Sequence, residues 1–426
     1  MTLEEQIFEN HYKYYKEVGV ETIKIESGYI EQVSADYQGR VIYELLQNAF
    51  DRAENNIFVQ VKENSLYVAN DGKKFTYSAN HDYKNGKSDQ LVFERGDFQS
   101  MCSISTSTKN AVTSIGNKGV GFKSAFSIAN SANIYTQGII INNTERQEEK
   151  ISFRLYDSFK DINTISNDFS ENIRANIKEN IISIQRESNL QNRGVPGYYF
   201  PLHIYEEPEF IKELFEKGYV TVIQIPFEDK NLISKLFDEI KNIHFQFVQL
   251  KYEQDFNIEF VFDDETFERT IKKNAEGLFE IEVVSENLLP LAQKAGVDIK
   301  QAKVALIIKE DAEGLFYNYL STLEPSPFKY IDFHADFHTK VDRTNINFKD
   351  GDIGKYNHAL LRACIELYFS VLNGYLEEDK RIKLKLLYIN ESKVDFHLSK
   401  FEWLLIDFIL DKKHFKLYFD IIQDVL

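Results

Sequence analysis

Three glycines within six positions, Gly116, Gly119 and Gly121, constrain this chain more than any other feature. Because glycine has no Cβ atom, its backbone can approach a ligand closely and adopt positive φ. The apolar run from Ser124 to Ala129 is compatible with a helix, whose unpaired N–H groups and dipole would point back at the glycines. This combination predicts an anion cradle, most often for phosphate. A tight turn without a ligand is the alternative, because a glycine cluster alone is weak evidence.

A polar stripe marks the helix that the sequence predicts over residues 40–53. The apolar positions of this segment follow the spacing of one buried helix face. Glu44, Asn48 and Asp51 lie at i, i+4 and i+7, so they share a different face. Asn is disfavoured inside helices, and solvated helix faces usually carry Lys and Glu. The stripe therefore favours a functional surface over an ordinary solvated face.

A β-hairpin is predicted next, because residues 57–61 and 65–69 alternate apolar and polar side chains. Its second strand ends in Asn70-Asp71-Gly72, a turn rich in side-chain acceptors. Further strands are predicted at 133–142, 150–155, 217–226, 257–262, 303–309 and 329–337, with helices at 3–18, 97–104 and 355–372. We expect a first domain over residues 1–226, a second α/β domain over 227–375, and a mainly helical segment over 376–426.

Composition limits the classes of function. The formal net charge of −17 argues against a general nucleic-acid binder, which needs basic faces. A local basic row at Arg381, Lys383 and Lys385 leaves a nucleic-acid or acidic-partner contact open, with protection of a sheet edge as the alternative. Two distant cysteines suit a reducing cytoplasm. No apolar run has the length of a membrane span, and residues 1–5 lack a signal-peptide core. We therefore expect a cytoplasmic protein that does not contact a membrane.

Three elements stand in order: Glu-xxx-Asn on a helix, an Asp-Gly turn after a strand, and Gly-xx-Gly-x-Gly before a helix. This order resembles the GHKL ATPase superfamily, with its Bergerat nucleotide-binding fold. Residues 44–51 resemble its N-box, and residues 115–124 resemble its glycine motif. The amino-acid sequence of residues 70–75, 107–109 and 119–124 looks most like that of the sacsin and NO VEIN branch. The resemblance covers residues 37–226 and implies an α+β protein: a two-layer α/β sandwich domain, then a transducer-like domain and a helical end.

The resemblance also implies roles for single residues. Glu44 would act as general base on the attacking water or orient it, and Asn48 would contribute an amide oxygen to Mg²⁺. The family's adenine-binding Asp corresponds to Asn70, while Asp71 lies one residue later, so either is a candidate. Thr221 resembles the family's threonine near adenine. The remaining predicted nucleotide contacts are Asp51, Gly72, Thr108, Lys109, Gly116, Lys118, Gly119, Val120, Gly121 and Phe122.

A second-domain cation is expected to reach the γ-phosphate, because the segment from Asp336 to Ile346 resembles the second domain of the same branch. Arg343 is the first candidate and Lys340 the second. Such a contact would make hydrolysis depend on domain docking. A salt bridge at a strand end is the alternative for these side chains.

The resemblance implies a slow, Mg²⁺-dependent ATPase that binds ATP and ADP and switches a protein partner, with transient homodimerisation. Members of this branch in bacteria often belong to multi-protein systems, so an anti-phage defence or quality-control role is expected. A nucleotide-binding regulatory module that does not hydrolyse ATP is the alternative. A protein histidine kinase is a weaker one, because no phosphoacceptor helix is expected before the nucleotide domain.

Overall fold

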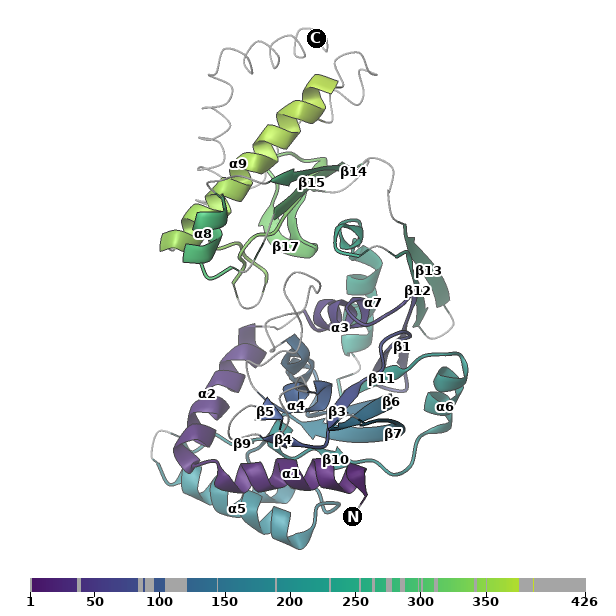
Figure 1. The fold of residues 1–426 in the computed structure, drawn as a ribbon, viewed down its shortest axis with the longest axis vertical. Helices are drawn as coiled ribbons and strands as arrows, with labels where there is room; N and C mark the ends of the chain where they lie inside the picture. The colour runs from purple at the N-terminus through teal and green to yellow at the C-terminus, as the bar shows by residue number, and fades with distance from the viewer. Residues whose placement is uncertain are drawn as a thin grey trace. The chain divides into compact units, whose positions relative to one another are not determined.

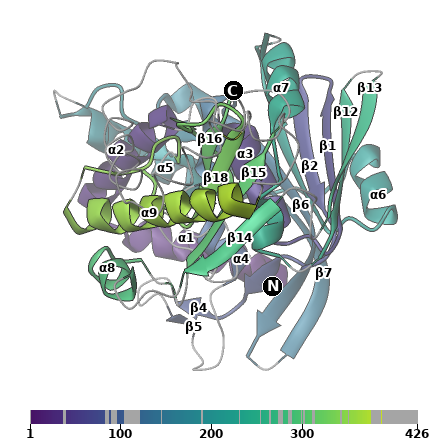
Figure 2. The ribbon, with the colours of Figure 1, turned by 90° about the horizontal axis from the view of Figure 1, so that it is seen from above.

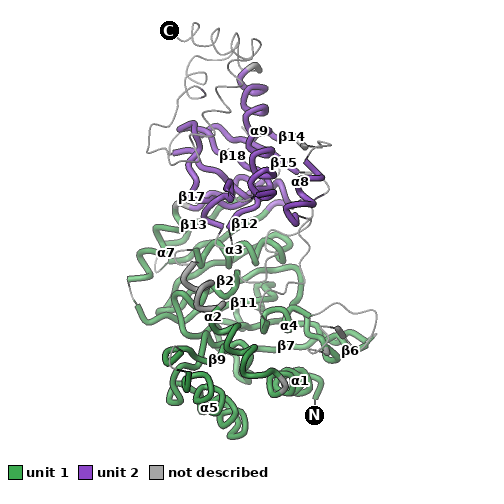
Figure 3. Tube along the Cα trace, turned by 90° about the vertical axis from the view of Figure 1, so that its left-hand side faces the viewer, with its two compact units in different colours: residues 1–110, 114–242, 256–270 green, residues 111–113, 243–255, 271–426 purple. Residues whose placement is uncertain are grey.

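The structure is a computed structural model. It describes residues 2–36, 40–82, 87–88, 96–103, 121–143, 145–187, 190–229, 231–252, 254–262, 265–272, 278–283, 288–297, 299, 302–309, 313–340, 343–349, 351–374 and 386. Within these residues the chain is mixed α and β, in agreement with the expected α+β class (Figure 1). It divides into two compact units, coloured in Figure 3: residues 1–110, 114–242 and 256–270 form unit 1, and residues 111–113, 243–255 and 271–426 form unit 2.

A mixed sheet with strand order β10-β7-β6-β11-β2-β1-β12-β13 is the framework of unit 1. Its strands are β1 (Asn56–Lys62), β2 (Ser65–Asn70), β6 (Ser131–Asn142), β7 (Glu145–Tyr156), β10 (Leu202–His203), β11 (Thr221–Pro226), β12 (Phe256–Phe262) and β13 (Glu265–Ile271). A short strand, β3 (Thr76–Ser78), pairs with β6. The predicted hairpin is confirmed as β1 and β2, which pair antiparallel from Ile57↔Asn70 to Lys62↔Ser65.

Helices lie on both faces of this sheet (Figure 2). On one face, α6 (Glu209–Glu216) packs Ile211, Leu214 and Phe215 against strand residues that include Phe58 and Val222. On the other face lies α3 (Val41–Phe50), which confirms the helix predicted over 40–53 and contacts β2. The other helices of unit 1 are α1 (Leu3–Glu17), α2 (Val20–Asp36), α4 (Asp97–Met101), α5 (Glu171–Gln185) and α7 (Asn231–Asn242).

The helix expected after the glycines differs in type from a regular α-helix. Residues Gly121–Ser127 form a 3-10 helix, which is short and tightly wound. The dipole at its start is therefore smaller than that of a long α-helix, and the glycine backbone itself must provide more of any attraction for an anion.

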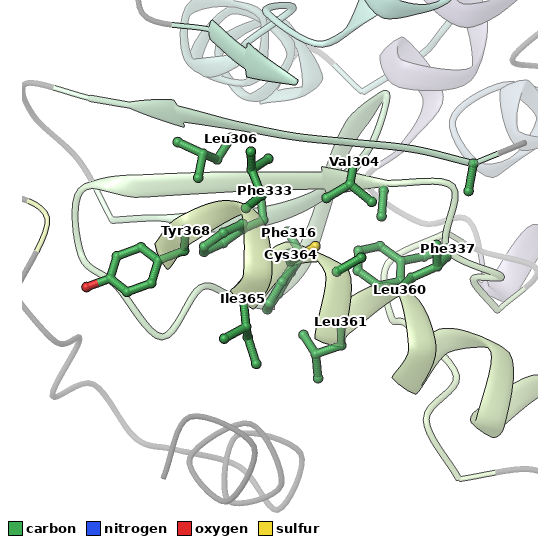
Figure 4. Packing of buried hydrophobic residues seen from close by; sticks show 14 of the residues in the cluster. Val304, Leu306, Phe316, Phe333, Phe337, Leu360, Leu361, Cys364, Ile365 and Tyr368 are labelled. Carbon is green, nitrogen blue, oxygen red and sulfur yellow. The ribbon is translucent and has the colours of Figure 1, made fainter. Parts of the chain in front are cut away.

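Unit 2 is a sheet with strand order β14-β15-β18-β16-β17, covered by a long helix. The strands are β14 (Leu278–Val283), β15 (Ala302–Ile308), β16 (Leu315–Asn318), β17 (Leu320–Pro325) and β18 (Ile331–Ala335), and the helices are α8 (Leu288–Lys294) and α9 (Gly351–Gly374). Figure 4 shows Leu360, Cys364 and Tyr368 of α9 among buried side chains from the sheet, such as Phe316 and Phe333. The predicted strands 303–309 and 329–337 and the predicted helix 355–372 are confirmed with shifted ends.

The two predicted domain limits, at residues 226 and 375, stay predictions. Two elements that follow residue 226 are nevertheless part of unit 1: α7 contacts α3, and β12 pairs in parallel with β1 from Asn56↔Asn257 to Val61↔Phe262. Apart from Leu386, the predicted C-terminal segment, with Arg381, Lys383 and Lys385, lies outside the described residues.

Candidate nucleotide site

The carboxylate of Glu44 lies directly against Gly121. Glu44 is 3% exposed on the middle of α3, and α3 packs against the 3-10 helix that begins at Gly121. A Cβ atom on Gly121 would overlap Glu44 Oε2. The structure thus brings the first residue of the polar stripe into contact with the last glycine of the motif, although the two are far apart in sequence.

The polar stripe on α3 is partly enclosed. Asn48, on the same helix as Glu44, is half-buried, and Asp51, which directly follows the last residue of the helix, is buried. One turn before Glu44, the guanidinium carbon of the buried Arg40 lies 4.3 Å from the centre of the Tyr43 ring. The buried Arg40 therefore adds a positive charge, shielded from solvent, at the start of the helix that carries Glu44.

Asp71 ties the end of α3 to the hairpin. Its Oδ1 accepts hydrogen bonds from the N–H groups of Glu54 and Asn55 at 2.8 and 3.0 Å. Its Oδ2 accepts from the backbone N–H and side-chain amide of Asn56, at 3.0 and 2.8 Å. Gly72, at φ 88°, passes so close to Glu54 and Arg52 that no Cβ would fit. Because both oxygens already accept, Asp71 fixes the loop between α3 and β1.

Asn70 is placed differently, at the last position of β2 opposite Thr221 of β11. Both residues are buried, at 6% and 8% exposed. The Asn70 side-chain amide donates to the Asp71 carbonyl oxygen at 2.7 Å, which fixes the orientation of the amide group. Among the described residues nothing donates to Asn70 Oδ1, so this oxygen is an oriented acceptor beside Thr221.

A buried lysine that sequence reasoning missed follows the glycines. Lys123 is 3% exposed; its Nζ donates to the Met101 carbonyl oxygen and lies 4.7 Å from the centre of the Tyr198 ring. Burial lowers the pKa of Lys123 to about 8, and the neighbouring Cys102 thiol opposes that shift slightly. The only sequence signal was a lysine within the segment from Phe122 to Ile128, whose other residues are apolar or serine. Lys123 anchors the 3-10 helix that carries Gly121.

Several predicted site residues cannot be placed. Thr108, Lys109, Gly116, Lys118, Gly119 and Val120 lie outside the described residues. Phe122 is buried and its ring packs edge-on against Phe126, with 6.0 Å between ring centres. Phe122 is thus a core residue whose backbone alone remains available for a ligand.

Lys340 and Arg343 belong to unit 2, where they share one turn. The Arg343 N–H donates to the Lys340 carbonyl oxygen at 3.1 Å, and the bridge Thr339↔Ile346 closes the turn. Arg343 has φ 57°, a left-handed conformation that non-glycine residues seldom adopt. Their predicted contact with a γ-phosphate stays a prediction.

No protein-family model matches the sequence, and comparison with curated proteins gives no significant match. No helix in the described ranges has the length and apolar character that crossing a bilayer requires. The described residues also hold no cluster of three or more His, Cys, Asp or Glu side chains arranged for a metal. A Mg²⁺ ion held by one amide oxygen, phosphates and water does not require such a cluster.

Proposed function

We propose that this protein binds ATP with Mg²⁺ and hydrolyses it slowly, as a conformational switch of the GHKL type. The observation that carries the proposal is the buried Glu44 carboxylate against Gly121. A phosphate cradle made by the glycine motif would end beside this carboxylate, which is where an attacking water must be oriented. Asn48, one turn further along α3, would contribute its amide oxygen to the metal.

Asn70, rather than Asp71, is the better candidate for adenine. An exocyclic amino group donates hydrogen bonds, and Asn70 Oδ1 is an oriented acceptor next to Thr221, whereas the Asp71 oxygens accept from the loop after α3. Asn70→Ala is expected to weaken ATP binding about tenfold, the loss of roughly one good hydrogen bond. Asp71→Ala should instead lower the unfolding midpoint in urea. Equal ATP affinity of Asn70→Ala and wild type, measured by calorimetry, would contradict this assignment.

The hydrolytic step is tested at Glu44. Glu44→Ala should retain ATP binding in calorimetry and lose about a hundredfold or more in turnover, the usual contribution of a general base. Glu213→Ala, which removes an exposed carboxylate from α6 on the opposite sheet face, is the control and should leave both quantities unchanged. Wild-type turnover no higher than that of Glu44→Ala would favour the regulatory module that does not hydrolyse ATP. Absence of ATP binding by wild type would refute both functions.

The downstream part of the proposal is a protein partner, with transient dimerisation of the ATP-bound chain and a role in defence or quality control. It rests on the resemblance of the motifs. Capture of one partner in the presence of ATP, and not of ADP, by the wild type but not by Asn48→Ala would support it. Capture that is the same with either nucleotide would show that the chain does not act as an ATP-dependent switch.

A further inference from the structure

A short connection between two elements of unit 1 belongs to unit 2. The chain leaves unit 1 at the end of α7, contributes residues 243–255 to unit 2, and returns to unit 1 at β12 (Figure 3). We call residues 243–255 the strap. Its two ends are covalently continuous with one unit, while its contacts are with the other.

The strap packs on the face of the unit 2 sheet that is opposite α9. On β18, Ile331 and Phe333 belong to the core formed with α9, and the alternating residues Asp332 and His334 lie on the opposite face. The Gln246 side-chain amide donates to Asp332 Oδ2 at 2.8 Å. The Phe247 ring stacks on His334, with 5.4 Å between ring centres and an interplanar angle of 26°.

Two lysines complete this docking. Lys303 Nζ, from β15, donates to the Leu250 carbonyl oxygen of the strap at 2.8 Å. Lys251 Nζ, from the strap, lies 4.9 Å from the centre of the Tyr319 ring. The strap is therefore held by specific polar contacts as well as by buried apolar side chains such as Phe247 and Val248, and the polar contacts depend more strongly on geometry.

One buried donor in this interface lacks an acceptor. His334 Nδ1 accepts from the Tyr319 N–H at 3.1 Å, so a neutral ring carries its proton on Nε2. Within the described part of the chain, Nε2 has no hydrogen-bond partner and is fully buried. An unpaired buried donor makes this interface less stable than full pairing would.

The ends of the strap lead back to the candidate nucleotide site. Before the strap, α7 contacts α3. The charge of Arg40, directly before α3, also interacts electrostatically with the carboxyl group of Glu239 on α7. After the strap, the Phe256 ring lies 5.2 Å from that of Phe50, the last residue of α3. The Asn257 N–H donates to the Asn55 carbonyl oxygen at 2.7 Å, in the loop that Asp71 holds. Both ends of the strap are thus attached to the helix that bears Glu44.

We propose that the strap couples the Glu44 helix to the unit 2 sheet, so that a change in α3 or its loop alters strap docking on β18. That ATP is the natural cause of such a change rests on the proposed function. The coupling itself does not need nucleotide, because it follows from chain connectivity and packing. Such coupling requires one element whose conformational equilibrium is influenced both by α3 and by the unit 2 sheet.

The test uses hydrogen exchange of the full chain, read by mass spectrometry without nucleotide. Asp71→Asn weakens the hold on residues 54–56 and should speed exchange in 243–252 and in β18 by about threefold or more. Adding Gln246→Ala should abolish the effect of Asp71→Asn on β18. Adding Asn318→Ala should not, although it also removes one 2.8 Å hydrogen bond from a half-buried amide of unit 2, to the Phe337 carbonyl oxygen.

Two results would overturn the strap proposal: β18 exchange that ignores Asp71→Asn, or an effect that survives Gln246→Ala undiminished. A parallel calorimetric titration with ATP and Mg²⁺ reports on the proposed function alone. If the wild type binds no ATP while the exchange pattern holds, the proposed function fails and the coupling stands.

Discussion

At the scale of single residues, Gly121 leaves room for the Glu44 carboxylate, the proposed general base. Gly121→Ala places a methyl group where Glu44 Oε2 lies, so the carboxylate has to swing away. Turnover should fall about tenfold or more, equivalent to about 1.4 kcal/mol of barrier. A steady-state ATPase assay measures this change. Gly19→Ala, whose added Cβ meets nothing within 4 Å, is the matched control and should keep wild-type turnover. If Gly121→Ala turned over ATP as fast as Gly19→Ala, the position of the Glu44 carboxylate would not matter for hydrolysis.

His334 makes the stability of unit 2 depend on pH. Burial lowers the pKa of His334 to about 4; the Asp336 charge opposes this shift, and those of Lys251 and Lys303 add to it. Because the folded pKa lies below the ordinary 6.5, the unfolded chain binds the proton more readily between these values. Stability is therefore complete above pH 6.5 and is lost as the pH falls through 4.

Replacing His334 should flatten this dependence. His334→Gln does not titrate and keeps a polar side chain of similar size at this position. Urea unfolding at pH 7 and pH 4 should show that wild type loses about 2–3 kcal/mol more than the variant between these conditions. His244→Gln, at an exposed histidine of unit 2, should keep the wild-type slope. A slope unchanged by His334→Gln would place the acid sensitivity elsewhere.

At the scale of elements, α3 and the β1–β2 hairpin were predictable because their patterns are local. The apolar spacing of α3 and the alternation of residues 57–69 both encode a single buried face. The partners of these elements were not predictable. Nothing in residues 256–262 indicates pairing with β1, since strand pairing over such a separation depends on the whole fold.

The candidate site was predictable to a similar extent. The sequence placed Glu44 and Asn48 on one stripe but left Asn70 and Asp71 as alternatives for adenine. The alignment of the motif does not show which of the two side chains is hydrogen-bonded to the loop after α3. The hydrogen bonds of Asp71 to residues 54–56 exist only in three dimensions. The same is true of Lys123, whose acceptor and aromatic neighbour come from distant segments.

The contact between α7 and α3 should be sensitive to pH. Burial raises the pKa of Glu239 on α7 to about 7, and the Arg40 guanidinium opposes this. The folded pKa lies above the ordinary 4.5, so the folded state holds a proton that the unfolded chain has lost between these values. The stability of unit 1 therefore falls as pH rises from 4.5 to 7.

Glu239→Gln mimics the protonated group and should remove that fall. The variant should be more stable than wild type at pH 7.5, by about 1–2 kcal/mol after allowance for partial solvent screening, and equally stable at pH 4.5. Urea unfolding at the two pH values measures the difference. Glu213→Gln, at an exposed position of α6, should change neither value. Greater stability of Glu239→Gln at pH 4.5 as well would point to packing rather than charge.

At the scale of the whole molecule, the expected cation from unit 2 is tested best by substitution. A fragment that ends near Pro226 would lack α7 and β12, which are part of unit 1, so its loss of activity would have two explanations. Arg343→Ala in the full chain avoids this problem. A guanidinium acting on the γ-phosphate should affect turnover more than affinity for ADP, which has no such group.

The expected result is a turnover reduced at least about tenfold in Arg343→Ala, or about 1.4 kcal/mol of barrier, with unchanged ADP affinity. Lys340→Ala should have the smaller effect. Lys329→Ala serves as the control, since this lysine of unit 2 belongs to the connection between β17 and β18, where its Nζ lies 5.6 Å from the centre of the Tyr330 ring, and not to the turn that holds Arg343. ATPase assays and ADP calorimetry provide the two readouts. Full turnover in Arg343→Ala would show that the arginine belongs to the structure of its turn alone.

The parallel pairing of β1 with β12 also governs how the protein is made. These strands lie about 200 residues apart in the sequence, so β1 leaves the ribosome long before its second neighbour exists. Until residue 262 has emerged, the edge of β1 presents unpaired backbone groups and the ring of Phe50 lacks that of Phe256. The nascent chain therefore passes through a stage in which this open strand edge favours association with other chains, and faster synthesis of residues 63–262 would shorten that stage.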